Sequence, residues 1–232
     1  TTKKLEVPDS TPYFAKKTID LTSIDSLNNG HPAKEYLLSR KIPDLSRFYY
    51  VSKFKEWVNT QKPRTFDNLQ NDRPRIIIPL LRHDGTMFGI QGRSLEANPS
   101  LRYISIMFED QPKIFGLDKI NTDETIYITE GPFDSTFVEN SVAMCGSDID
   151  IRTFGWSDYI WVFDNEPRNK QIVNRISTAI DRGDKVVIWD KSIKEKDINE
   201  MVLQGYDPYA IIKHNTFSGL QAKLKLADWK KV

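Results

Sequence analysis

The stretch that decides the fold reads TIYITEGPFDSTFVENSVAMCGSDIDIRTFGWSDYIWVFDNE and runs from Thr125 to Glu166. It holds two short apolar runs, residues 126–129 and 159–163, and each leads directly into a carboxylate. These carboxylates are Glu130, which is followed by a glycine, and Asp164, which opens an Asp-Asn-Glu triplet. Short, nearly continuous apolar runs are typical of strands that are covered on both faces of a sheet.

The segment between the two runs predicts a helix over residues 132–140, with Pro132 in its first turn. Residues 142–145 predict a further buried strand. Strands that alternate with helices favour parallel pairing, and the ends of parallel strands meet along one sheet edge, where open α/β sheets bind ligands. We therefore expect Glu130 and Asp164 to face each other across an acidic cleft.

An isolated Glu-Gly or Asp-x-Glu pair is common, but the order strand-Glu-Gly, helix, strand-Asp-x-Glu is specific. This order resembles the Toprim domain, which primases, topoisomerases and a group of nucleases share. The resemblance implies that Glu130, Asp164 and Glu166 are catalytic and hold a metal ion for phosphoryl transfer. It also implies that Asp134, in the motif EGPFD, is a supporting metal-site residue.

Length and composition indicate an ordinary globular protein. The 232 residues can form one large or two small domains, and 39% of them are hydrophobic and 28% charged. No apolar run approaches the roughly 20 residues of a membrane helix, and no signal peptide is visible, so no membrane partner is expected. Cys145 is the single cysteine and the three histidines are scattered, so zinc is not expected in this chain. We predict that Cys145 is a buried strand residue.

The charge is unevenly distributed, although the net charge is only +1. Residues 1–122 carry 19 Lys and Arg against 14 Asp and Glu, whereas residues 123–232 carry 14 against 18. A solvated mixed surface would account for this, but a basic lobe beside an acidic one is also what a metal-dependent nucleic-acid enzyme needs.

The N-terminal half contains helical and hairpin patterns. Residues 1–18 predict a linker or tail, and residues 19–59 predict helices, including AKEYLLSR and SRFYYVSKFKEWV, whose aromatic residues we assign to a core. Residues 75–95 predict a β-hairpin with Asp84-Gly85 as its turn, followed by a strand at RYISI and a turn at KIFGLDKI.

The hairpin region is similar to the lobe that precedes Toprim in bacterial and phage primases. That resemblance places Arg93, Arg102 and Lys113 along the path of template and nucleotide. Ordinary surface cations are the alternative for each of them.

The segment after Glu166 predicts a helix over residues 169–181 that is capped by Gly183, and then a strand, KVVIWD, with Asp190 at the same sheet edge. The loop KSIKEKDINE resembles a Lys-Asp-x-Asn-Glu signature of phage primases. The resemblance adds Asp197 to the metal-site residues. It also assigns nucleotide or nucleic-acid binding to three further residues, Lys191, Lys196 and Asn199.

The last segment, residues 208–232, predicts helix that packs on the sheet, with Leu220, Leu224 and Ala227 on one face. The predicted organisation is a tail (1–18), an N-terminal lobe (19–122), a Toprim domain (123–206) and a C-terminal helical segment (207–232). The fold class is α/β, a Toprim fold with a mostly parallel sheet, preceded by an α+β lobe.

Taken together, residues 17–232 are similar to the primases of T-even-type bacteriophages, most specifically at EGPFDS, VFDNEPR, WDKS and KDIN. The resemblance implies a DNA-directed RNA polymerase that makes short primers on single-stranded DNA from ribonucleoside triphosphates. It also implies Mg²⁺ or Mn²⁺ as cofactor, a hexameric replicative helicase as partner and the cytoplasm of the infected bacterial host as location. The zinc module of the family is not among these residues, so we expect a catalytic core. Without a GxxxxGK[ST] motif, helicase activity is assigned to a partner.

Two other functions remain open at this stage. A Toprim nuclease would use similar carboxylates to cut rather than join, and the hairpin lobe before Glu130 favours the primase. A non-catalytic helicase-binding or DNA-binding module is the other alternative, although clustered carboxylates without a use would only destabilise the fold. A topoisomerase is disfavoured because the chain has no room for strand-passage domains.

Overall fold

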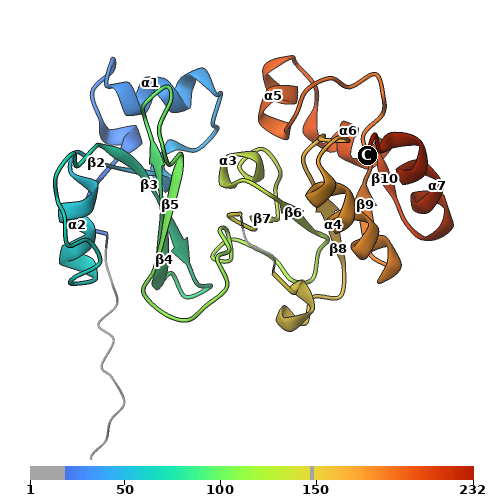
Figure 1. Cartoon of the computed structure of the whole chain (residues 1–232), viewed down its shortest axis with the longest axis horizontal. Helices are drawn as coiled ribbons and strands as arrows, with labels where there is room; N and C mark the ends of the chain where they lie inside the picture. The colour runs from blue at the N-terminus through green and yellow to red at the C-terminus, as the bar shows by residue number, and fades with distance from the viewer. Residues whose placement is uncertain (1–18, 147–148) are drawn as a thin grey trace, which may run out of the picture.

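The computed structural model describes residues 19–146 and 149–232, which form two five-stranded sheets arranged along the long axis of the molecule (Figure 1). The tail predicted for residues 1–18 lies outside the described residues. The N-terminal sheet has the order β1-β2-β3-β4-β5 and is antiparallel throughout. Its strands are β1 (Thr22–Ser23), β2 (Tyr49–Val51), β3 (Arg75–Leu81), β4 (Met87–Ser94) and β5 (Tyr103–Met107). The predicted hairpin is confirmed as β3–β4.

The prediction of helices over residues 19–59 is wrong in part. Two helices form there, α1 (Pro32–Ser39) and α2 (Phe54–Gln61), but β2 lies between them. The reason is that successive side chains there face opposite sides: Tyr49 packs against one hydrophobic core and Tyr50 against the other. Alternation of this kind suits a strand that is covered on both faces.

The second sheet has the order β10-β9-β8-β6-β7, and its inner pairings are parallel, as predicted. Its strands are β6 (Ile126–Thr129), β7 (Ser141–Ala143), β8 (Tyr159–Val162), β9 (Lys185–Val187) and β10 (Thr216–Phe217). The sequence did not indicate β10, which adds to β9 in antiparallel orientation within the segment predicted as helix. Cys145 is buried as predicted, but in a turn after β7 rather than in the strand.

The helix predicted over residues 132–140 is much shorter, because α3 spans only Pro132–Ser135. The Ser141 hydroxyl lies 2.6 Å from the carbonyl oxygen of Ser135, to which the N–H of Glu139 would donate in a longer helix. The N–H of Glu139 donates to the Tyr209 hydroxyl instead. Asn140 then takes a left-handed conformation (φ 50°) that turns the chain into β7.

The remaining helices surround the parallel sheet. They are α4 (Lys170–Asp181), α5 (Ile198–Leu203), α6 (Pro208–His214) and α7 (Gly219–Trp229), and the 3₁₀ turns are η1 (Ile24–Ser26), η2 (Leu45–Arg47) and η3 (Ile151–Phe154). Helix α4 begins one residue after the predicted start and ends at Asp181 as predicted, and Gly183 follows it in a left-handed conformation (φ 89°). The face predicted for the last helix is wrong, because Leu220 and Leu224 are 73% and 64% exposed. The buried face of α7 instead consists of Ala222, Leu226 and Trp229.

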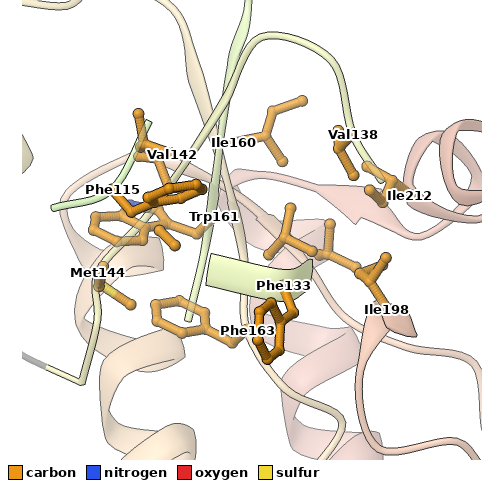
Figure 2. Packing of buried hydrophobic residues seen from close by; sticks show 14 of the residues in the cluster. Phe115, Phe133, Val138, Val142, Met144, Ile160, Trp161, Phe163, Ile198 and Ile212 are labelled. Carbon is orange, nitrogen blue, oxygen red and sulfur yellow. The ribbon is translucent and has the colours of Figure 1, made fainter. Parts of the chain in front are cut away.

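One hydrophobic core continues from the N-terminal sheet into the parallel sheet. Phe48, which precedes β2, has its ring 5.4 Å from that of Phe133 in α3 and 6.2 Å from that of Phe115. Figure 2 shows the C-terminal part of this core, where Phe133, Ile198 and Ile212 come from α3, α5 and α6. A smaller core under α2 covers the other face of the N-terminal sheet. The shared core holds the two lobes against each other and so fixes the space between them.

Candidate active site

The carboxylates that follow β6 and β8 lie together, as the parallel topology predicts. The main-chain N–H of Asp164 donates to Glu130 Oε1 at 3.2 Å. The other oxygen of Glu130, Oε2, lies 3.6 Å from Nη1 of Arg175 on α4. Glu130, at the end of β6, and Asp164, at the end of β8, therefore form one pair of neighbouring carboxylates.

Asp134 joins this pair because Gly131 leaves room for it. A Cβ atom at position 131 would lie 2.6 Å from Asp134 Oδ2, so any other residue here would displace this carboxylate from its place beside the strand end. Asp134 Oδ1 also accepts a hydrogen bond from the main-chain N–H of Asn199 at 3.0 Å. Asp197 caps the same helix, α5, by accepting from the N–H of Glu200 at 2.8 Å.

The four carboxylates Glu130, Asp134, Asp164 and Asp197 are called the sheet-edge carboxylates below. Burial, together with the negative charge of Glu130 and Asp134, raises the pKa of Asp164 to about 8. Burial and the charge of Asp197 raise the pKa of Asp134 to about 7. Burial also raises the pKa of Glu130 and of Asp197. Each shift means that the ionised group lacks enough positive charge nearby, which is the electrostatic setting that a bound cation would relieve.

Lys196 supplies part of that positive charge. Its Nζ lies 3.7 Å from Asp164 Oδ2 and 3.3 Å from Glu166 Oε1. Burial lowers the pKa of Lys196, but the two carboxylates outweigh it and the net shift is upward. Lys196 is therefore a counter-ion of the carboxylates in the metal-free protein.

A cavity of about 280 Å³ lies against the sheet-edge carboxylates and receives residues from both lobes. The cavity is also lined by Arg40 and by four residues that lie in β4, in β5 or directly before β5. These four residues are called the β4–β5 wall below: Gln91, Arg93, Arg102 and Tyr103. Carboxylates of one lobe and cations of the other thus line the same space. That arrangement can hold a substrate that carries both metal-bound and cation-bound phosphates.

The residues predicted to bind nucleotide are placed differently from one another. Arg93 is 7% exposed, and its Nε and Nη2 donate to the hydroxyl of Tyr36 at 3.0 and 2.7 Å. Arg102 is exposed at the cavity, whereas Lys113 is half-buried and does not line it. Lys191 forms an ion pair with Asp228 of α7 at 2.6 Å, outside the cavity.

Asn199 joins the lobes instead of pointing into open solvent. It is 1% exposed, its Oδ1 accepts from Arg40 Nη1 at 2.7 Å, and its Nδ2 donates to the Arg40 carbonyl at 2.7 Å. Arg40 follows α1 in the N-terminal lobe. Asp190, expected at the same edge, is exposed, accepts from Ser192 and does not line the cavity.

Sequence reasoning missed four residues of this site: Arg40, Gln91, Tyr103 and Arg175. Gln91 had a usable signal, because it precedes Arg93 by two residues in a strand and therefore faces the same side. Arg40 and Arg175 had none, since only the packing of α1 and α4 brings them to the sheet edge.

Among the described residues, no group of three acidic, histidine or cysteine side chains is disposed to hold a metal ion. The type of donor nevertheless fits, because carboxylate oxygens are the ligands that Mg²⁺ and Mn²⁺ prefer. The raised pKa values of the sheet-edge carboxylates fit it too. The predicted ligands Glu130, Asp164 and Glu166 are directed in part toward Arg175 and Lys196, so these contacts compete with a metal for the same oxygens. No helix in the described ranges is long and apolar enough to cross a membrane.

The fold is that of primase catalytic cores. The E. coli primase catalytic core gives a TM-score of 0.60 at 16% identity, over 83% of this chain and 75% of that chain. The RNA polymerase domain of Mycobacterium tuberculosis primase DnaG gives 0.57 at 16% identity, over 78% and 75%. A DnaG primase catalytic domain bound to single-stranded DNA gives 0.63 at 15% identity, over 90% and 78%. The class of fold is therefore the Toprim-containing fold of primase catalytic cores.

The family follows from sequence. The DNA primase of Enterobacteria phage T4 is 33% identical over 245 residues, which cover 99% of this chain and 71% of the relative. A scan against models of known families gives no match. At this identity and coverage the chain belongs to the DNA primase family, and it is a phage-type primase catalytic core.

Proposed function

We propose that this chain joins ribonucleoside triphosphates into RNA primers on single-stranded DNA, in the cavity between the sheet-edge carboxylates and the β4–β5 wall. The observation that carries the proposal is the lining of that cavity, in which carboxylates and arginines from different lobes are combined. The T4 relative supports the reaction, and a solved DnaG relative bound to single-stranded DNA supports the template.

Nucleotide joining is an in-line attack of a 3′ hydroxyl on an α-phosphate, with negative charge that grows on the entering and leaving oxygens. Glu130, Asp164 and Glu166 are proposed to hold divalent metal, with Asp134 and Asp197 in support. A metal ion at these carboxylates supplies the positive charge that the entering and leaving oxygens need. On the other side, Arg102 would hold phosphates, since carboxylates alone would repel them, and Arg93 would contact the nucleotide beside it.

The remaining parts of the proposal rest on the relatives. A hexameric replicative helicase as partner and the cytoplasm of an infected bacterium as location come from the family resemblance and the phage relative. The nuclease and the non-catalytic module are not favoured, because the matched relatives are primases.

The test is an assay with labelled ribonucleotides, a single-stranded template and Mg²⁺, with and without added helicase. We expect labelled RNA that depends on the template and on the divalent cation. Cleavage of the template without RNA synthesis would instead favour the nuclease, and neither product would contradict the proposed function.

Arg102, which lines the cavity, and Lys113, which does not, give a prediction about salt. If Arg102 and Lys113 contact phosphates, Arg102→Ala and Lys113→Ala should each reduce the slope of log affinity against log salt by up to about 0.7, the share of one phosphate on a single strand. Single-strand affinity measured across a salt series checks this. Lys223→Ala is the matched control, because Lys223 pairs with Asp181 on α4, away from the cavity. If the slope changes equally in all three variants, the template does not contact Arg102 or Lys113 specifically.

A further inference from the structure

Three buried side-chain atoms in the described residues lack a hydrogen-bond partner, and two of them belong to the β4–β5 wall. Trp57 Nε1 belongs to a ring that packs on the smaller core. The other two, Gln91 Oε1 and Arg93 Nη1, come from residues that are 4% and 7% exposed and that line the cavity with the sheet-edge carboxylates. Gln91 and Arg93 are two apart on β4, so they face the same side of the sheet.

The orientation of the Gln91 amide is determined by its surroundings. Its Nε2 donates to the main-chain carbonyl of Cys145 at 3.3 Å and to Ser105 Oγ at 3.2 Å. A carbonyl only accepts, so the reversed amide would bring two acceptors together at Cys145. The unpartnered atom is therefore the oxygen, a hydrogen-bond acceptor.

The Arg93 guanidinium is also held in place. Two of its nitrogens donate to the Tyr36 hydroxyl, and its plane lies near the rings of Tyr36 (5.4 Å) and Tyr103 (4.9 Å). Only Nη1 is left without a partner. The β4–β5 wall thus holds one unsatisfied acceptor and one unsatisfied cationic donor. Each of these atoms has less than 1 Å² of accessible surface, so a ligand in the cavity reaches them through a small shift of the wall.

These two atoms require different things of a ligand. Arg93 Nη1 needs an acceptor, which a phosphate or a hydroxyl provides. Gln91 Oε1 needs a donor, which an ionised phosphate does not provide and a sugar hydroxyl does. A buried polar atom without a partner destabilises its state, so a ligand that offers a hydroxyl is favoured over one that lacks it.

We propose that Gln91 and Arg93 form a subsite for the 2′ hydroxyl of the incoming ribonucleotide. In this subsite Gln91 Oε1 is the group that favours a ribonucleotide over a 2′-deoxyribonucleotide. The inference rests on the proposed function, which supplies the substrate class. It makes Gln91 a specificity-determining residue and not a catalytic one.

The test compares ATP with 2′-deoxy-ATP and 3′-deoxy-ATP in single-nucleotide addition. Gln91→Met keeps the length of the side chain and removes its oxygen and nitrogen. We expect the ratio of kcat/KM for ATP to that for 2′-deoxy-ATP to fall about tenfold, through loss on ATP alone. Ser105→Ala is the matched control, because it removes another partner of the same amide, leaves Oε1 in place and should keep the ratio.

Three results would overturn the subsite. Equal losses on ATP and 2′-deoxy-ATP would mean that Gln91 is only structural or that its oxygen binds water. If only the ratio of kcat/KM for ATP to that for 3′-deoxy-ATP changes, Gln91 recognises the 3′ hydroxyl and not the 2′ hydroxyl. Equal equilibrium binding of ATP and 2′-deoxy-ATP by the unmodified protein would also contradict it, and this measurement needs no variant to fold. Failure of the unmodified protein to add any nucleotide would overturn the proposed function, while the binding comparison would still decide on Gln91.

Discussion

Asp164→Asn is expected to lower primer synthesis by about 10³-fold, which corresponds to about 4 kcal/mol of lost transition-state stabilisation. The reason is that Asp164 is the central member of the sheet-edge carboxylates, beside Glu130 and within 3.7 Å of Lys196. An amide of the same shape keeps the packing but loses the charge that would hold a divalent cation. Glu130→Gln should behave in the same way. Primer synthesis is measured at saturating Mg²⁺.

The same substitution should make the metal-free protein more stable. The pKa of Asp164 is about 8 in the folded chain, against an ordinary value of 3.8. Because the folded-state pKa is raised, stability is lost as pH rises from about 4 toward 8, where the buried carboxylate must ionise. Asparagine carries no such charge. Allowing for partial exposure, we expect a gain of about 1–3 kcal/mol at pH 8, or about 2–10 °C in Tm.

Asp190→Asn is the control for both measurements, since Asp190 follows the neighbouring strand β9 but is exposed and lies outside the cavity. Its activity and Tm should stay close to those of the unmodified protein. Adding Mg²⁺ should raise the Tm of the unmodified protein and of Asp190→Asn, but not that of Asp164→Asn. Primer synthesis by Asp164→Asn at the normal rate would refute a catalytic role for the sheet-edge carboxylates.

Asn199→Ala is expected to destabilise the protein by about 1–3 kcal/mol, because it leaves two partly buried partners unsatisfied. These are the Arg40 guanidinium and the Arg40 carbonyl, each 2.7 Å from the Asn199 amide. The main-chain bond from Asn199 to Asp134 does not depend on the side chain, so Asp134 should keep its position. Urea unfolding at constant pH measures the change.

Gln204→Ala is the matched control, since Gln204 is exposed at the end of the same helix and should change stability by no more than about 0.5 kcal/mol. In a double-mutant cycle with Arg40→Met, the coupling with Asn199→Ala should be about 1–3 kcal/mol. Additive effects would show that the two residues do not join the lobes, and Asn199 would again be a candidate for nucleotide contact.

The meeting of Glu130 and Asp164 among the sheet-edge carboxylates could be predicted from local sequence patterns. Runs of four or five apolar residues that each lead into a carboxylate specify buried parallel strands, and parallel strands bring their ends together whatever the rest of the fold does. Glu130 and Asp164 therefore meet as predicted. The prediction of a helix up to residue 140 was wrong because Ser141, from the next strand, bonds to the Ser135 carbonyl and Tyr209 takes the N–H of Glu139 that would have paired with it.

The sequence by itself determined the parallel strands β6 and β8, the meeting of Glu130 and Asp164 at their ends, and the family, because each depends on residues that are close together in the chain. Only the tertiary structure decided which side chains lie beside the sheet-edge carboxylates. Asn199 and Lys196 both follow the last parallel strand, yet one is buried against Arg40 and the other neutralises Asp164. Gln91 becomes a candidate for substrate recognition only because its oxygen is left without a partner in a cavity that two lobes enclose. Partners of this kind come from elements far apart in sequence, and which side chain remains unpaired is known only after all the others have packed.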